Sequence, residues 1–187
     1  MGYPKLSADV RGKGKLGSLA LRSALRSGIG PVIVVTKAGP VPDWLAEIEG
    51  EHQTEAYTRV ESPNAELGMA HSIRAGYAQA SRGQLRGIVI LLADMPLVTA
   101  EMIRDLADRY EAEPHLDFVA YRQGGLPLPP VLLASSMFPH LRHLEGDAGA
   151  RRLLQDPRFC GAFLQAETEL SLADLDTEED WALMPWS

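Results

Sequence analysis

The feature that most constrains the fold is a continuous apolar run at residues 88–93 that ends in a carboxylate, Asp94. The run begins after Gly87 and is stopped by Pro96. Such a run between breakers is typical of a strand buried on both faces of a parallel sheet. Ligand crevices of open α/β sheets lie beyond the carboxyl ends of these strands. We therefore expect Asp94 to face a ligand, since a carboxylate after an apolar run is costly unless it pairs or binds a metal. The alternative is that Asp94 only caps a turn with Pro96.

Helical and strand patterns alternate along the 187 residues. Helical apolar spacing from Leu16 to Ser27 precedes a β-branched strand at 32–36, and the chain closes with a helix at 178–184. Shorter strands are expected at 56–60, 117–121, 131–134, 159–164 and 170–172. The alternation predicts one α/β domain over residues 1–187, with three layers and a mostly parallel central sheet.

Composition narrows the class of protein. The chain carries a net charge of -7 and lacks the broad basic face of a nucleic-acid binder. No apolar run approaches the ~20 residues that cross a bilayer, and no secretory leader is evident. We therefore expect a cytoplasmic protein with no nucleic-acid or membrane partner. The single cysteine, Cys160, excludes an internal disulfide and is expected to fill core space on a strand.

Two segments in the first half of the chain carry candidate ligand-binding residues. Gly2 lies in a turn that delivers Lys5 shortly before a helix, where the ammonium could meet phosphates. Gly68 and Ser72 lie at the start of another helix, an arrangement that suits close backbone approach to a planar ring and a hydroxyl contact with it. His71 lies between them and is interpreted as a surface residue rather than a catalytic one.

A third segment, GDAGAR, contains Asp147 and Arg151. Asp147 is expected to cap the helix that follows, and Arg151 could pair with Asp147 or with a ligand anion. In both roles the arginine lies one helical turn beyond the aspartate.

A fourth segment, DLDTEED, contains a capping box formed by Thr177 and Asp180. The capping box leaves Asp174 and Asp176 unexplained. Together with Asp94, one of these two carboxylates could complete an oxygen-ligand site for a magnesium–phosphate complex.

Four segments together carry a family resemblance: LLADMPLVT, residues 68–76, GDAGAR and DLDTEED. In this order and at these intervals they closely resemble the molybdenum cofactor nucleotidyltransferases. The nearest match is the cytidylyltransferase branch, which includes accessory proteins of xanthine dehydrogenase-type enzymes. The resemblance spans essentially the whole chain and implies a nucleotide-binding α/β fold. It implies a Mg²⁺-dependent enzyme that joins CMP from CTP to molybdopterin and releases pyrophosphate.

The resemblance also implies roles for individual residues. Both reactants are anions, so the reaction needs charge neutralisation and alignment more than a nucleophilic side chain. Lys5 and Asp94 are then the catalytic residues: Lys5 contacts the triphosphate, while Asp94 and Asp176 hold the metal. The remaining candidates are Gly2, Gly68 and Ser72 for the nucleotide, and Asp147 and Arg151 for the pterin phosphate.

Two departures from the family pattern favour alternatives. The pattern opens with a strand and a loop, Leu-Ala-Ala-Gly-x-Ser-x-Arg, before Met-Gly-x-x-Lys, and Met1 is that methionine. We expect the first strand and loop to be missing, so that strands 32–36 and 88–93 flank an empty slot or a substitute strand. Pro129 stands where relatives have a histidine. A non-catalytic cofactor-binding or insertion partner of a molybdoenzyme apoprotein is therefore one alternative, and a guanylyltransferase of the same family is another.

Overall fold

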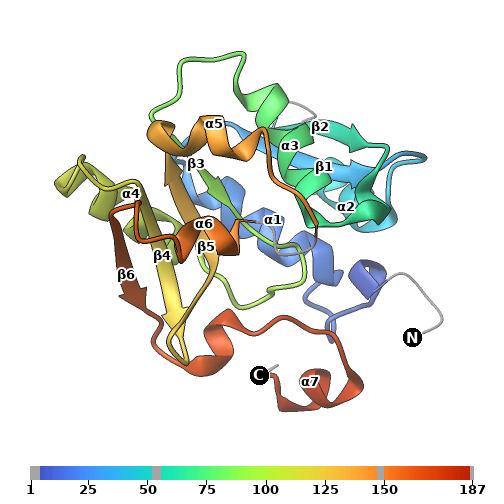
Figure 1. Cartoon of the computed structure of the whole chain (residues 1–187). Helices are drawn as coiled ribbons and strands as arrows, with labels where there is room; N and C mark the ends of the chain where they lie inside the picture. Colours follow the sequence, from blue (N-terminus) through green and yellow to red (C-terminus); the bar gives the residue numbers. More distant parts are fainter. Residues whose placement is uncertain (1–4, 52–55, 147–149, 186–187) are drawn as a thin grey trace.

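The computed structural model describes residues 5–51, 56–146 and 150–185 (Figure 1). The helices are α1 (Leu16–Ser27), α2 (Asp43–Glu51), α3 (Met69–Ala80), α4 (Ala100–Ala112), α5 (Phe138–Leu141), α6 (Arg151–Leu154) and α7 (Glu178–Leu183). The strands are β1 (Val32–Lys37), β2 (Tyr57–Ser62), β3 (Gly87–Ile90), β4 (Phe118–Gln123), β5 (Leu126–Ala134) and β6 (Gly161–Gln165). The described ranges also contain four 3-10 turns: η1 (Lys5–Ser7), η2 (Ala65–Leu67), η3 (Ser135–Met137) and η4 (Glu169–Leu172). No helix within these ranges has both the length and the apolar character of a membrane span.

The strands form two sheets, and the prediction of one mostly parallel sheet is wrong on this point. β1 and β2 pair in parallel, whereas the second sheet has the order β3-β5-β4-β6 and is mixed. The cause is a hairpin in which Gln123 pairs with Leu126 across a two-residue loop, Gly124 and Gly125. Both glycines have positive φ, 56° and 83°, as tight hairpin loops require. β5 therefore returns antiparallel to β4 and to β3, and within this sheet only β4 and β6 are parallel.

Strand β3 is shorter and less buried than the apolar run predicts. It ends at Ile90, and each of its residues is half-buried rather than enclosed on both faces. The reason is its position at the edge of the four-stranded sheet, where only β5 pairs with it. β1 likewise pairs on one side only, and in the described part of the chain β1 and β3 do not pair with each other. The expected slot for a missing strand between them stays a prediction. Asp94 lies in the turn that follows the apolar run.

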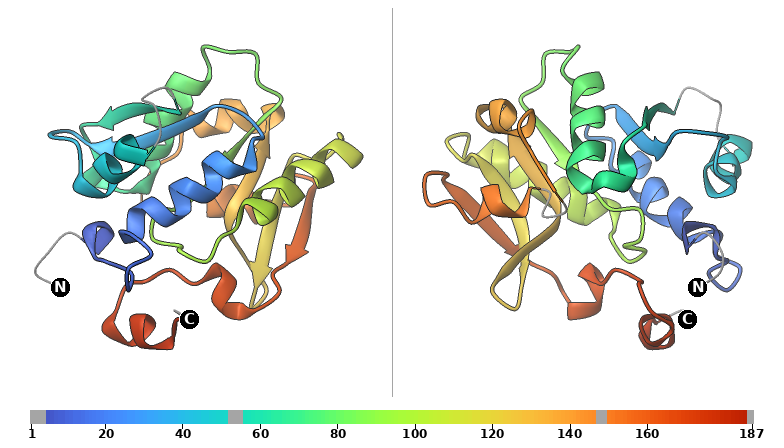
Figure 2. Two further views of the ribbon diagram at one scale, coloured as in Figure 1. Left: turned by 180° about the vertical axis from the view of Figure 1, so that it is seen from behind. Right: turned by 45° about the vertical axis from the view of Figure 1, so that its right-hand side comes forward.

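Helices cover both faces of the four-stranded sheet, so the expected three-layer arrangement is confirmed (Figures 1 and 2). On one face, Ile103 and Leu106 of α4 pack against Val119 of β4. On the other face, residues of α3, α5 and α6 pack against Phe118 and Leu133. α1 packs against α2 and α4, and α3 packs on β1 and β2. This arrangement leaves the loops beyond β3 and before α7 on one side of the molecule.

Two smaller expectations are also corrected. The strand expected at 170–172 is the 3-10 turn η4, because the Thr168 side chain caps it by accepting a hydrogen bond from the Ser171 backbone N–H at 3.3 Å. Cys160 is exposed rather than core filler. Its backbone N–H donates to Asp117 Oδ2 at 2.8 Å just before β6 begins, which fixes the backbone but leaves the thiol at the surface.

Candidate active site

Three charged side chains from distant parts of the chain meet in one cluster. Lys5 belongs to η1, Asp94 to the turn after β3, and Asp176 to the segment before α7. Lys5 Nζ donates to Asp94 Oδ2 at 2.9 Å and also to Asp176 Oδ1. Lys5 and Asp94 are three-quarters buried, whereas the Asp176 side chain is 68% exposed. The cluster therefore has a sheltered side at Asp94 and an open side at Asp176.

Backbone contacts hold the two carboxylates beside each other. The Leu175 backbone N–H donates to the Asp94 carbonyl oxygen at 3.2 Å, which ties the last loop to the turn after β3. Leu175 itself is fully buried with Val10 and Leu16. Because Asp176 follows this anchored leucine, its backbone lies near Asp94 independently of the ion pair.

Asp180, which the sequence predicts only as part of a helix cap, also supports the backbone of Asp176. The expected capping box is present: the Asp180 backbone N–H donates to Thr177 Oγ1, and the Asp180 carboxylate accepts from the Thr177 N–H at 2.6 Å. The same carboxylate also accepts from the Asp176 N–H at 2.9 Å. These hydrogen bonds, first of all the one from the Thr177 backbone, lower the pKa of Asp180. Asp180 thus orients the backbone of Asp176 through the same carboxylate oxygen that caps α7.

The electrostatics of the cluster favour a positive charge at its centre. Burial of Lys5 works against its charged form, but hydrogen bonds to Asp176 and Asp94 and attraction by both carboxylates outweigh burial and raise the pKa of Lys5. The ammonium is a stand-in cation that marks where these two carboxylates can hold positive charge. Two carboxylates with open space on one side suit Mg²⁺, which is commonly held by one or two carboxylates together with substrate phosphates and water.

The described residues do not form a closed metal site. Within the described ranges, no group of three or more His, Cys, Asp and Glu side chains is placed to hold a metal ion. Asp94 and Asp176 would therefore supply only part of a coordination shell, and a substrate would have to supply the rest. The residues fit a metal that arrives with phosphate oxygens better than a permanently bound ion.

The segment 68–76 and the beginning of GDAGAR also lie together. Gly68 has φ 118°, a conformation that favours glycine, and immediately precedes α3. The Ala70 backbone N–H donates to the Gly146 carbonyl oxygen at 3.2 Å, so the start of α3 contacts the first residue of GDAGAR. Ser72 is half-buried in the first turns of α3. His71 is half-buried, and its Nδ1 lies 3.0 Å from a guanidinium nitrogen of Arg74 on the same helix.

Some predicted residues are not joined to the Lys5–Asp94–Asp176 cluster. Gly2 and Asp147 lie outside the described residues. Arg151 is exposed at the start of α6, with Ala150 at the preceding position. Among the described residues, no hydrogen bond or ion pair links Arg151 to Asp94 or Asp176. Of the described candidates, the structure therefore brings Lys5, Asp94 and Asp176 together and leaves Arg151 apart from them.

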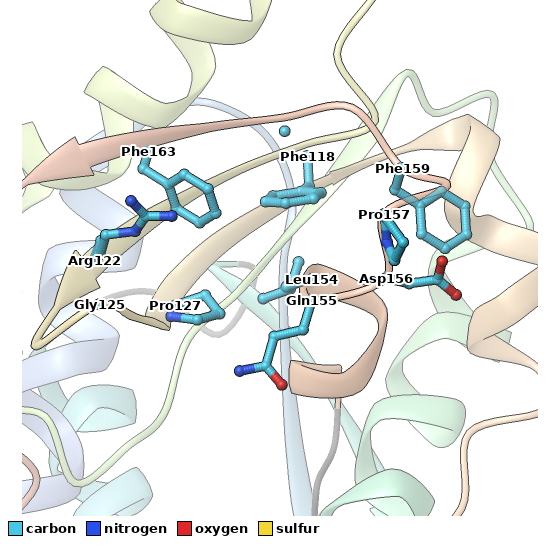
Figure 3. Close-up of a pocket in the computed structure, with 11 residues that line it drawn as sticks. Phe118, Arg122, Gly125, Pro127, Leu154, Gln155, Asp156, Pro157, Phe159 and Phe163 are labelled. Carbon is cyan, nitrogen blue, oxygen red and sulfur yellow. The ribbon is translucent and has the colours of Figure 1, made fainter.

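A cavity of about 330 Å³ between β4, β6 and α6 contains none of the predicted site residues (Figure 3). The Arg122 guanidinium lies over the Phe163 ring, 3.9 Å from its centroid. Phe118 lies edge-on to Phe163, with ring centroids 5.6 Å apart. The sequence signal for this packing is Gly161, since a Cβ there would lie 2.0 Å from Phe118 Cζ.

The three-layer α/β fold, with Lys5 and Asp176 beside Asp94 in the turn after β3, indicates a nucleotide-binding class of protein. The model of the MobA-like NTP transferase domain matches residues 1–163 of the sequence. The chain belongs to this family, and the family resemblance drawn from the sequence is confirmed.

Individual relatives agree with this assignment. The chain is 32% identical over 187 residues to the purine catabolism protein PucB of Bacillus subtilis (strain 168), covering 98% of this chain and 89% of that protein. The crystal structure of Rv0371c from Mycobacterium tuberculosis H37Rv superposes with a TM-score of 0.75 at 21% identity, over 97% of this chain and 88% of that one. The same protein has been crystallised with manganese, and that structure superposes with a TM-score of 0.74 at 20% identity, over 96% and 89% of the two chains.

A further solved structure is the molybdopterin-guanine dinucleotide biosynthesis protein A of Archaeoglobus fulgidus. It superposes with a TM-score of 0.64 at 17% identity, over 97% of this chain and 88% of that one. At these identities the structural matches establish the fold alone.

Proposed function

We propose that the chain is a cytoplasmic, Mg²⁺-dependent nucleotidyltransferase that joins CMP from CTP to the phosphate of a molybdopterin-type acceptor. The observation that carries the proposal is the convergence of Lys5, Asp94 and Asp176, since the ammonium can contact a triphosphate and the two carboxylates can hold a metal that neutralises and orients it. Mg²⁺ would supply further charge neutralisation at the α-phosphate.

In this reaction an oxygen of the acceptor phosphate attacks the α-phosphorus of the nucleotide. The bond from the α-phosphorus to the bridging oxygen breaks, and pyrophosphate leaves with the electron pair. Lys5 compensates the negative charge that develops on the leaving pyrophosphate. Asp94 and Asp176 would hold the metal, with Asp180 fixing the backbone that carries Asp176. No side chain has to act as a nucleophile.

The base and acceptor sites complete the proposal. Gly68 would allow the backbone to approach the base closely, and Ser72 would contact the base or ribose, while Gly2 would belong to the triphosphate loop. Asp147 and Arg151 would contact the acceptor, because an arginine guanidinium matches the geometry of a phosphate. The contact between Ala70 and Gly146 supports placing the two substrates side by side.

A second candidate is a binding or insertion partner of a molybdoenzyme apoprotein. It is favoured by a relative named for purine catabolism and by Pro129, which cannot donate or accept a hydrogen bond through its side chain. A third candidate within the first class is guanylyl transfer from GTP. The three are separated by whether the chain turns over a nucleotide and which nucleotide it prefers.

The test is pyrophosphate release from CTP and from GTP, with Mg²⁺ and molybdopterin, by the native chain and by Asp94→Asn. We expect CTP to be preferred and Asp94→Asn to lose about 100-fold or more, because it removes transition-state charge stabilisation. The matched control is Glu111→Gln, which breaks the exposed Arg86–Glu111 pair on α4 and should keep the native rate. Release that is equal for Asp94→Asn and the native chain would overturn the role of Asp94, and preference for GTP would overturn the choice of base.

A further inference from the structure

Within the proposed function, we infer that Lys5 is an internal counter-cation that keeps a free divalent ion out of the Asp94–Asp176 pair until a nucleoside triphosphate arrives. The metal and the nucleotide then enter as one complex, and the triphosphate takes over Lys5. The inference goes beyond the assignment of the three residues, because it states the order in which their partners change.

The positions of the Lys5 hydrogen bonds explain how Lys5 excludes a free divalent ion. Lys5 Nζ bonds to one oxygen of each carboxylate, Oδ2 of Asp94 and Oδ1 of Asp176, so the ammonium occupies the space between them. A divalent ion held by the same two oxygens would need that space, since metal–oxygen distances for Mg²⁺ are about 2.0–2.1 Å. The two cations cannot share the position, and in a three-quarters buried setting their repulsion is only partly screened. A free ion must therefore displace Lys5 without offering it another anion.

A triphosphate removes this obstacle. Its oxygens supply the anionic partner that Lys5 loses when it leaves the carboxylates, and they also supply the metal ligands that the protein lacks. Once Lys5 has moved to the triphosphate, the Asp94 and Asp176 carboxylates carry two negative charges without a cation between them, so they attract the incoming metal. The exposed side of the cluster, at Asp176, gives the incoming complex access. Exchange of partners thus satisfies every charge, whereas metal alone leaves Lys5 unpaired.

The competing explanation is that Lys5 merely fastens η1 to the last loop. Other contacts already provide that anchoring, because Leu6, next to Lys5, packs against the cluster that contains Leu16 and Leu175. The Leu175 N–H to Asp94 carbonyl hydrogen bond ties the two loops without the lysine. Ion pairs as exposed as that to Asp176 contribute little to stability. Removing the charge should therefore leave the fold intact.

The test is calorimetric or paramagnetic titration with Mn²⁺ alone, without nucleotide or acceptor, of the native chain and of Lys5→Met. We expect Lys5→Met to bind Mn²⁺ about tenfold or more tighter than the native chain, since a repelling charge has been removed. The same variant should bind the Mn²⁺–CTP complex more weakly. If Lys5 were purely structural, Lys5→Met would change the affinities for Mn²⁺ and for Mn²⁺–CTP in the same direction. Opposite changes in the two affinities therefore indicate that Lys5 exchanges the carboxylates for the triphosphate.

Two controls keep the result interpretable. Lys15→Met removes the lysine of the Lys15–Asp43 pair and should leave Mn²⁺ affinity unchanged. Lys5→Arg keeps the charge and should bind free Mn²⁺ as weakly as the native chain. Equal or weaker Mn²⁺ binding by Lys5→Met, or a gain in Lys5→Arg as large as in Lys5→Met, would overturn the inference. Because the titration involves no turnover, this outcome is separate from failure of the proposed reaction, which pyrophosphate release detects.

Discussion

Gly161→Ala is predicted to be strongly destabilising, because the backbone of β6 lies directly against a buried ring. An added Cβ would lie 2.0 Å from Phe118 Cζ and within 2.4 Å of two further ring carbons. Phe118 is only 2% exposed and packs against Phe163, so the ring cannot simply rotate into solvent. Overpacking of this kind costs about 1–3 kcal/mol, and the closeness of the contact places Gly161→Ala at the upper end.

For a chain of this size each kcal/mol lowers the melting temperature by about 2–4 °C. We therefore expect Gly161→Ala to melt about 6–12 °C below the native chain by circular dichroism. The matched control is Gly30→Ala, since a Cβ there meets no atom within 4 Å and should change the melting temperature little. Adding Phe118→Leu to Gly161→Ala should recover part of the loss by removing the ring. Melting of Gly161→Ala within about 1 °C of Gly30→Ala would refute the packing of β6 on β4 described here.

Three further changes test other parts of the structure. The side-chain hydrogen bonds from Arg158 lower the pKa of Asp156 to about 2. This stabilisation is present above the ordinary pKa of about 3.9 and is lost as pH falls toward 2. Arg158→Ala should therefore raise the pKa of Asp156, followed by NMR, although the backbone hydrogen bond from residue 158 still lowers it in part. Gly124→Val forces a β-branched residue to φ 56° and should lower the free energy of unfolding in urea by about 1–2 kcal/mol; an unchanged value would argue against the hairpin. Thr177→Ala removes the cap of α7 and should cost about 1 kcal/mol in the same assay, with no loss expected if the capping box does not form.

Local patterns predict α1 and α7 well because the information that sets them is local. α1 begins and ends where the apolar spacing indicates, and Gly28, with φ 67°, closes it as a left-handed cap. The capping box of α7 is likewise readable from Thr177 and Asp180 alone. Both are set by neighbours within a few residues, so tertiary context changes little.

Sheet topology is predicted less well because the decisive signals compete. Gly124-Gly125 between two apolar segments is a hairpin signal, but Pro127, Pro129 and Pro130 argue against a strand immediately after it. In the structure the pairing passes from Ala120–Val131 to Tyr121–Leu128, so Pro129 and Pro130 fall in a bulge and need no ladder partner. The whole of residues 126–134 is therefore one strand, where the sequence predicts only its last part.

The candidate site is predicted by resemblance rather than by spacing. Lys5 is 89 residues from Asp94 and 171 residues from Asp176, so no periodicity can bring them together. Carboxylates after strand ends indicate a ligand site, but the partner of Asp94 depends on how the last loop returns to the sheet. The hydrogen bond from the Asp176 N–H to Asp180 is not predicted from the sequence either, because the capping box already accounts for Asp180.

The most direct test of nucleotidyl transfer follows the label of the nucleotide itself. The native chain is incubated with Mg²⁺, molybdopterin and CTP labelled either at the α-phosphate or at the γ-phosphate. We expect the α-label to appear in the acceptor product and the γ-label only in pyrophosphate, in equal amounts. Binding of CTP by the native chain with both labels remaining in CTP would contradict nucleotidyl transfer and favour the non-catalytic alternative.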